Sequence, residues 1–287
     1  MTLGDMLVCL DSTDPSEGRL KLAAHLAHDH GAHLLGVYAM RDVDDGPLFE
    51  SREQWGGPPG GVGLLERNVA ASGPRGTMRA EQIEQRFRDT LRLNGIDGDW
   101  HPIDGADTAE LIMLAKSVDL AVLGQYSREI RDRMAFRPEE IAVACGRPVL
   151  IVPYAGHFER VGGHVLIAWD GTREAIRALN DALPLLAKAQ SVTVMTVLVQ
   201  QNEFDRAHAG LQRAVRHLER HRIPARAEEA MRGDLAVSDV LLSRAADLGA
   251  DMIVAGAYHH SPLREALIGG VSRELLQHMT VPLLMSH

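Results

Sequence analysis

The chain has 287 residues, of which 45% are hydrophobic and 24% charged, and its formal net charge is −9. This length corresponds to two domains of ordinary size, and the composition is that of a globular protein. An acidic chain without an apolar run of roughly 18 residues offers neither a surface for nucleic acid nor a membrane span. We therefore expect two domains, no nucleic-acid partner and no membrane partner.

The start of the chain and its cysteines bear on its location. Residues 1–5 lack the basic and apolar pattern of a secretory signal. The two cysteines, Cys9 and Cys145, each stand in an apolar context, which is typical of buried thiols rather than of a disulfide. These features predict a cytoplasmic protein.

The first half of the chain alternates apolar runs with segments of helical periodicity. Its predicted elements are, in chain order, a strand over 6–11, a helix over 15–30, and strands over 33–38, 119–124 and 148–152. Residues 41–76 interrupt this order with a stretch rich in glycine and proline, which predicts a long loop.

The second half repeats this order. Its predicted elements are a strand over 165–170, a helix over 172–188, strands over 192–198 and 251–256, a helix over 271–279 and a strand over 282–285. Such alternation, with apolar strands, predicts parallel sheets buried on both sides. The sequence therefore predicts an α/β fold of two tandem doubly wound domains, over 1–154 and 163–287. Each would have a five-stranded parallel sheet with helices on both faces.

Two features of the second half meet at the carboxyl end of its predicted sheet, where ligands bind in open α/β sheets. Asp170 ends the first strand, and its carboxylate could accept hydrogen bonds from a ribose hydroxyl or a base edge. Gly269 and Gly270 precede the last helix. A glycine pair at a helix N-terminus lets backbone N–H groups approach phosphate oxygens.

These residues resemble the universal stress protein family in its tandem two-domain form, and the resemblance covers nearly the whole chain. ATP-binding members of that family carry a loop read as Gly, two residues, Gly, nine residues, Gly, and then Ser or Thr. Gly256 and Gly269 match the first and third glycines, whereas His259 replaces the second and Gly270 replaces the Ser or Thr. The resemblance implies an adenine nucleotide alpha hydrolase-like fold.

The resemblance also implies an ATP site, with or without Mg, in the C-terminal domain. The residues expected to bind the nucleotide are Asp170, Thr196 and Val197 for adenine and ribose, and Gly256, His259, Gly269, Gly270, Val271 and Ser272 for the phosphates. Because His259 adds bulk where the family has bare backbone, two outcomes stay open at this position. The imidazole either crowds the phosphates or donates to them.

The first copy departs further from the family loop. It keeps Asp11 and Gly124, but Ser127 stands at the second glycine and Arg137 at the third. Backbone that carries these side chains does not approach a phosphate in the same way, so we predict a degenerate site. The arginines of residues 128–137 could meet an anion, although a solvated basic loop is the favoured interpretation.

Other clusters do not predict catalysis or metal binding. His25, His28, His30 and His33 are spread across the predicted turn at Gly31, and no cysteine or carboxylate set completes a metal site. The sequence contains neither a Gly-x-Ser-x-Gly elbow nor a Walker loop. We predict no catalytic residues and no metal site, and at most a weak ATPase activity.

The sequence thus predicts a stress-response regulator that binds ATP through its C-terminal domain. Family resemblance implies that the last strands pair, 149–152 against 283–286, as an intramolecular pseudo-dimer, and the whole chain could dimerise further. Two alternatives stay open. One is a nucleotide-free scaffold that binds protein partners, with the 41–76 loop as a contact. The other, less favoured, is a small-molecule hydrolase on the same fold.

Overall fold

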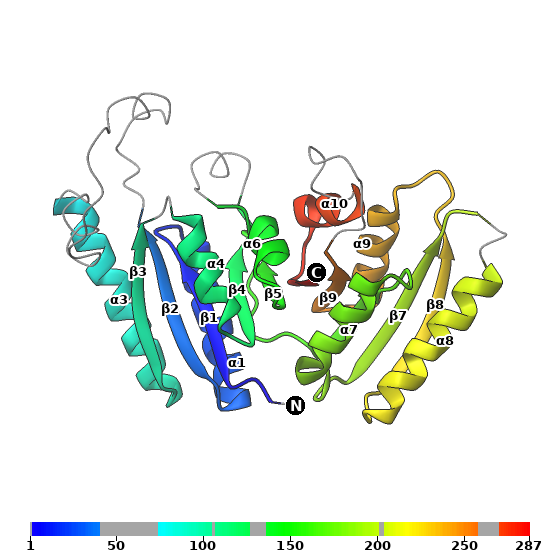
Figure 1. Cartoon of the computed structure of the whole chain (residues 1–287), viewed down its shortest axis with the longest axis horizontal. Helices are drawn as coiled ribbons and strands as arrows, with labels where there is room; N and C mark the ends of the chain where they lie inside the picture. Colours follow the sequence, from blue (N-terminus) through cyan, green and yellow to red (C-terminus); the bar gives the residue numbers. More distant parts are fainter. Residues whose placement is uncertain (1, 41–73, 105–106, 127–135, 201–203, 258–269) are drawn as a thin grey trace.

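The computed structural model describes residues 2–40, 74–104, 107–126, 136–200, 204–257 and 270–287. Its strands form one ten-stranded sheet in the order β3-β2-β1-β4-β5-β10-β9-β6-β7-β8 (Figure 1). The predicted loop over 41–76 ends three residues early, because a helix begins at Pro74. Residues 41–73 lie outside the described residues.

The first copy occupies one half of the sheet. Its strands are β1 (Asp5–Leu10), β2 (His33–Met40), β3 (Gly98–Asp104), β4 (Leu120–Gly124) and β5 (Val149–Val152). Its helices are α1 (Pro15–His30), α3 (Pro74–Asn94), α4 (Thr108–Lys116) and α6 (Pro138–Ala144). All neighbouring strands within this copy pair in parallel.

The second copy repeats the arrangement in the other half. Its strands are β6 (His164–Ala168), β7 (Ser191–Leu198), β8 (Ala225–Met231), β9 (Met252–Gly256) and β10 (Leu283–Ser286). Its helices are α7 (Arg173–Leu186), α8 (Phe204–Arg220), α9 (Val237–Asp247) and α10 (Gly270–His278). These strands also pair in parallel, so the predicted pair of doubly wound, five-stranded domains is confirmed.

Two hydrophobic clusters lie on opposite faces of the sheet. Leucines of α1, α7 and α8 and Phe87 of α3 bury one face, and residues of α4, α6, α9 and α10 bury the other. The apolar strands fit this arrangement because both of their faces are removed from water. None of the helices in the described ranges combines the length and apolarity needed to cross a bilayer.

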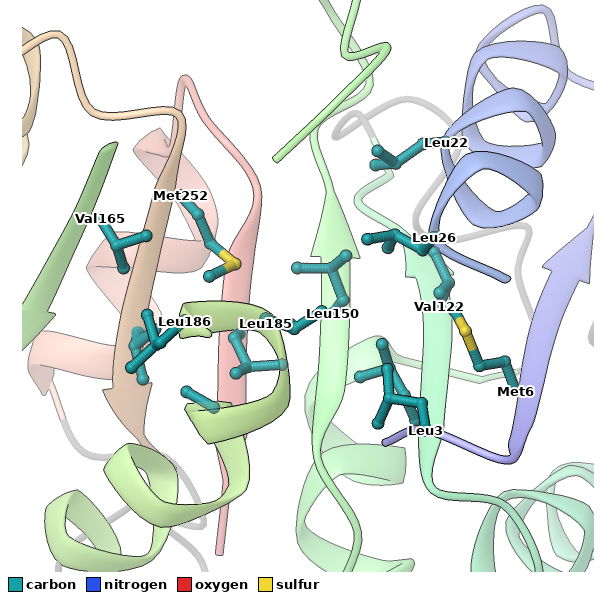
Figure 2. Packing of buried hydrophobic residues seen from close by; sticks show 14 of the residues in the cluster. Leu3, Met6, Leu22, Leu26, Val122, Leu150, Val165, Leu185, Leu186 and Met252 are labelled. Atoms are coloured by element: carbon teal, nitrogen blue, oxygen red, sulfur yellow. The ribbon is translucent and has the colours of Figure 1, made fainter. Parts of the chain in front are cut away.

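The two copies join through their last strands, as predicted. β5 and β10 pair antiparallel, with Leu150 opposite Leu284. Leu150 packs in the same cluster as Leu26 of α1 and Leu185 of α7, where the two copies meet (Figure 2). The pairing covers two strand edges that would otherwise be exposed, which leaves β3 and β8 as the outer edges of the sheet.

An aspartate at the equivalent position of each copy fixes the start of that copy. Asp119 accepts hydrogen bonds from the backbone N–H groups of residues 4 and 5, at 2.8 and 3.2 Å. Asp251 accepts from those of residues 162–164, at 2.8, 2.9 and 3.2 Å. Because each aspartate precedes the fourth strand of its copy, it aligns that strand with the first, and the carboxyl ends of both strands lie together.

Candidate functional site

A pocket of about 380 Å³ opens at the carboxyl end of the second copy's sheet. It lies between the ends of β6, β7 and β9 and the first turns of α7, α9 and α10. Its apolar lining comprises Ala168, Trp169, Ala175, Met195, Val197, Val237, Leu241, Ala255, Val271 and Leu275. Its polar lining comprises Asp170, Thr172, Glu174 and Ser272, together with Gly256 and Gly270. This volume and this apolar character are typical of small-molecule sites.

Asp170 stands at the pocket wall two residues after β6, which ends at Ala168 and not at Asp170 as the sequence predicts. Its Oδ1 accepts hydrogen bonds from the backbone N–H of Thr172 at 2.9 Å and from the Thr172 hydroxyl at 2.6 Å. Thr172 in turn caps α7, because its Oγ1 accepts from the N–H of Ala175 at 3.2 Å. This turn fixes the direction of an exposed carboxylate beside the pocket.

Alternate residues of β7 face the pocket. Val197, one of the residues expected to bind the nucleotide, lines it, and so does Met195, which sequence reasoning missed although it lies two positions earlier on the same face. Thr196 is not among the lining residues. Its buried hydroxyl donates to the carbonyl of Trp169 at 2.9 Å, so this side chain holds the end of β6 against β7.

The first turn of α10 forms the opposite wall. Gly270 is exposed, and a Cβ added there would meet no atom within 4 Å. Ser272 is buried, and its hydroxyl donates to the carbonyl of Gly256 at 3.3 Å, which ties α10 to the end of β9. Of the predicted phosphate-binding residues, His259 and Gly269 lie outside the described residues.

Gly256 has a packing role of its own. A Cβ at this position would lie 2.7 Å from the backbone nitrogen of Ala175 and 2.7 Å from the carbonyl carbon of Glu174. The glycine therefore lets the start of α7 rest directly on the end of β9. The buried Glu174 carboxylate accepts a hydrogen bond from Arg173. Burial alone would raise the pKa of Glu174, but this bond, its backbone N–H and the nearby positive charges outweigh burial and lower it.

Comparison with known families identifies this half of the chain. Residues 163–287 match the family model of the universal stress protein family. The C-terminal half of the chain belongs to the universal stress protein family.

Solved structures extend the likeness in fold to the whole chain. A universal stress protein from Archaeoglobus fulgidus has a TM-score of 0.72 at 14% identity, over 98% of this chain and 95% of that chain. A protein of unknown function from Pseudomonas aeruginosa has a TM-score of 0.59 at 14% identity, over 99% and 92%. At such identities the likeness concerns the fold, which here is the tandem form.

A curated enzyme also shows partial similarity. Estradiol 17-beta-dehydrogenase 1 from Rattus norvegicus is 29% identical over 179 residues, which are 62% of this chain and 49% of the enzyme. The chain thus spans about half the length of that enzyme. Its sequence contains no Gly-x-Gly-x-x-Gly, the motif that brings backbone against a dinucleotide pyrophosphate. The similarity therefore adds no argument for hydride transfer.

The first copy differs from the universal stress protein domain at the same place. Arg19 of α1 is fully buried beside Asp11, with Nη2 2.7 Å from Oδ2. Its Nε donates to the carbonyl of Cys9 at 2.7 Å. Burial opposes the charge of Arg19, but Asp11 and its other neighbours raise the pKa of the guanidinium above its ordinary value. The pair is therefore a buried ion pair.

The last residue of β4 and a tyrosine two positions later complete this arrangement. Gly124 packs against the guanidinium, because a Cβ there would lie 1.9 Å from Arg19 Nη1. The Tyr126 hydroxyl donates to Asp11 Oδ2 at 3.4 Å, and its ring packs edge-on against Phe136. We call Asp11, Arg19 and Tyr126 the Arg19 cluster. It occupies the space between the ends of β1 and β4.

The helix equivalent to α10 is also unlike a phosphate site. α6 begins at Pro138, which has no N–H to donate, and continues with Glu139 and Glu140, whose charges repel an anion. Arg137, which stands at the third glycine of the family loop, lies near Glu140, with Nε 3.9 Å from Oε1. Ser127 and the arginines of 128–135 lie outside the described residues.

The histidines of the first copy turn to separate partners. His25 Nδ1 bonds to the carbonyl of Glu159 at 2.8 Å, and His28 Nδ1 to that of Asn94 at 2.9 Å. His33 Nε2 lies 3.2 Å from Asp99, and burial lowers the pKa of His30. Throughout the described residues, no three metal-binding side chains come together.

Proposed function

We propose that this chain is a regulatory protein whose second copy binds ATP in the pocket between β6, β7, β9 and α10. One observation carries the proposal. A universal stress protein domain here combines an apolar pocket of about 380 Å³ with an oriented carboxylate and an open helix N-terminus. A cytoplasmic location and a role in a stress response belong to the same proposal, as does Mg bound with the triphosphate.

Each part of the nucleotide has a matching wall. The adenine ring fits among Met195, Val197 and Leu241, where its burial removes apolar surface from water. The ribose hydroxyls would donate to the carboxylate of Asp170, a role that acidic residues at strand ends play in nucleotide-binding sheets. The phosphates would lie at the first turn of α10, where Gly270 carries no side chain that could cover the backbone N–H groups.

The polar groups of the pocket favour binding over turnover. Glu174 accepts from Arg173, the Ser272 hydroxyl donates to Gly256, and Asp170 is engaged by Thr172. Among the described pocket residues, the hydroxyl–carboxylate pair of Thr172 and Asp170 belongs to the turn that caps α7, because the same hydroxyl accepts from the N–H of Ala175. The site is therefore better suited to sensing a nucleotide than to consuming it.

A charge introduced at Val271 tests the proposal. Val271 is exposed in the first turn of α10, so Val271→Glu places a carboxylate beside the proposed phosphates without loss of core packing. Val271→Gln is the matched neutral control. Calorimetric titration should show that the Glu variant binds ATP roughly tenfold more weakly than the Gln variant, equivalent to about 1.4 kcal/mol. The affinity for adenosine should be the same in both variants.

Two results would contradict the proposal. One is a wild-type protein that takes up no ATP at millimolar concentration, which favours the scaffold alternative. The other is an equal loss of ATP and adenosine affinity in the Glu variant, because a carboxylate at this position discriminates only against a charged ligand that lies beside it.

A further inference from the structure

A residue of the first copy holds the helix that forms the phosphate wall of the second copy's pocket. Gln125 directly follows β4 and is buried. Its Nε2 donates to the carbonyl of Leu276 in α10 at 2.6 Å, and its Oε1 accepts from the N–H of Tyr154 at 3.3 Å. Both ends of this amide are therefore fixed, and one of them reaches across the junction between the copies.

The acceptor is a helix-end carbonyl. α10 ends at His278, so the carbonyl of Leu276 belongs to the last four, which have no partner inside the helix. α10 has only nine residues, and helices of this length have little stability of their own. A buried hydrogen bond from outside the helix therefore adds to the packing of Leu275 and Leu276 in keeping α10 formed.

The Arg19 cluster keeps Gln125 in place. On one side of Gln125, Gly124 packs against the Arg19 guanidinium. On the other side, the Tyr126 hydroxyl donates to Asp11. The backbone N–H of Gln125 itself donates to the carbonyl of Val152 at 2.8 Å. Arg19 and Asp11 thus hold the two residues that flank Gln125, the residue that reaches α10.

Another hydrogen bond between the copies avoids α10. Lys188 Nζ, after the end of α7, donates to the carbonyl of Asp29 in α1 at 3.0 Å, on the exposed surface. Like the bond from Gln125, it joins a side chain of one copy to a backbone carbonyl of the other. It therefore offers a matched control for a contact that joins the copies without touching the pocket.

We propose that the first copy is a fixed support for the second copy's ligand site, with Gln125 as the positioning residue that holds α10. The identity of the ligand rests on the proposed function, but the support itself does not. One cluster thus both pairs Arg19 with Asp11 and flanks Gln125 on either side.

Amide hydrogen exchange in the full chain without nucleotide tests the support directly. Gln125→Met keeps the length and burial of the side chain but removes the donor, so α10 amides should exchange roughly fivefold faster, the effect of about one hydrogen bond. At pH 8, Gln125→Glu should accelerate the exchange of α10 amides more than Gln125→Met does, because its negative charge faces the C-terminus of a helix. Lys188→Met should leave α10 exchange unchanged, and β1 and β7 amides should be unaffected in all three variants.

Titration then connects the support to binding. Gln125→Met should lower the affinity for ATP by about the same factor as it accelerates exchange. The affinity for adenosine should change little, since the residues proposed to contact adenine do not include the last turn of α10. Exchange of α10 at the wild-type rate in Gln125→Met would overturn the support, as would equal acceleration in Lys188→Met. A wild-type chain that binds no ATP but shows the predicted exchange pattern would refute the proposed function and leave the support standing.

Discussion

The guanidinium of Arg19 lies against Gly124, at the place where a Cβ on that glycine would come within 1.9 Å of Nη1. In the second copy the equivalent glycine, Gly256, lies instead against the backbone of Glu174 and Ala175. Both copies therefore need a glycine at the end of their fourth strand, for different contacts. In the first copy the glycine admits an internal cation, and in the second it admits the start of a helix that lines a pocket.

Substitution of Gly124 should be costly. Gly124→Ala forces the buried guanidinium away from Asp11, and a buried charge without its partner lowers the free energy of unfolding by about 3 kcal/mol. Urea denaturation measures the change. Gly18→Ala is the control, because a Cβ there meets nothing within 4 Å in the interior of α1, and it should stabilise by about 0.5–1 kcal/mol. Equal stability of the two variants would show that Arg19 is not held against Gly124.

The buried thiol of Cys9 should make stability fall at high pH. Burial raises the pKa of Cys9 from 9.0 to about 12, with Arg19 opposing the rise and Asp11 adding to it. The contribution is fully present below pH 9, where both states keep the proton. It is lost as pH rises towards 12, because the unfolded chain releases the proton first.

The slope of that loss approaches about 1.4 kcal/mol per pH unit inside this window. Denaturation of wild type and Cys9→Ala in parallel isolates it, since all other titrating groups are shared. The stability of the wild type relative to the variant should decline between pH 9 and 12. Parallel curves over this range would mean that the thiol titrates equally in both states.

Asp170 should determine the preference for ribose. Asp170→Asn keeps an oxygen that accepts from Thr172, so the turn persists, but it removes the charge proposed to bind the sugar hydroxyls. Wild type should prefer ATP over 2′,3′-dideoxy-ATP by roughly tenfold to a hundredfold, the worth of a hydrogen bond to a charged group, and the variant should lose most of this preference. Asp181→Asn, on α7 outside the pocket, also removes one carboxylate charge, and this variant should retain the preference for ATP. A preference unchanged in Asp170→Asn would place the sugar elsewhere.

Much of the fold was predictable because its signals are local. Apolar runs and helical periodicity identify the elements, and the internal repeat gives their order twice. The place of Asp170 was predictable for the same reason, since it closely follows a strand whose carboxyl end must face the ligand edge of the sheet. Met195 was within reach of the alternation that points to Val197.

The remainder depends on contacts between distant positions. Within the helix 15–30, Arg19 resembles any charged helical residue, and only its packing against Gly124, far along the chain, shows that it is buried. Gln125 and Leu276 are 151 positions apart, and neither has a sequence signal of its own. The contact of Arg19 with Gly124 and the bond from Gln125 to Leu276 are tertiary effects, which periodicity does not encode.

The number of ATP molecules bound per chain tests the central claim most directly. Equilibrium dialysis of labelled ATP against the full chain should saturate at about one per chain, and Val271→Glu should raise the half-saturating ATP concentration roughly tenfold. Glu139→Gln neutralises the equivalent position of α6. It should leave the number at one, because Asp11 of the first copy is still paired with the buried Arg19. Saturation at two per chain, or a half-saturating ATP concentration that Val271→Glu leaves unchanged, would contradict the assignment of the site to the second copy.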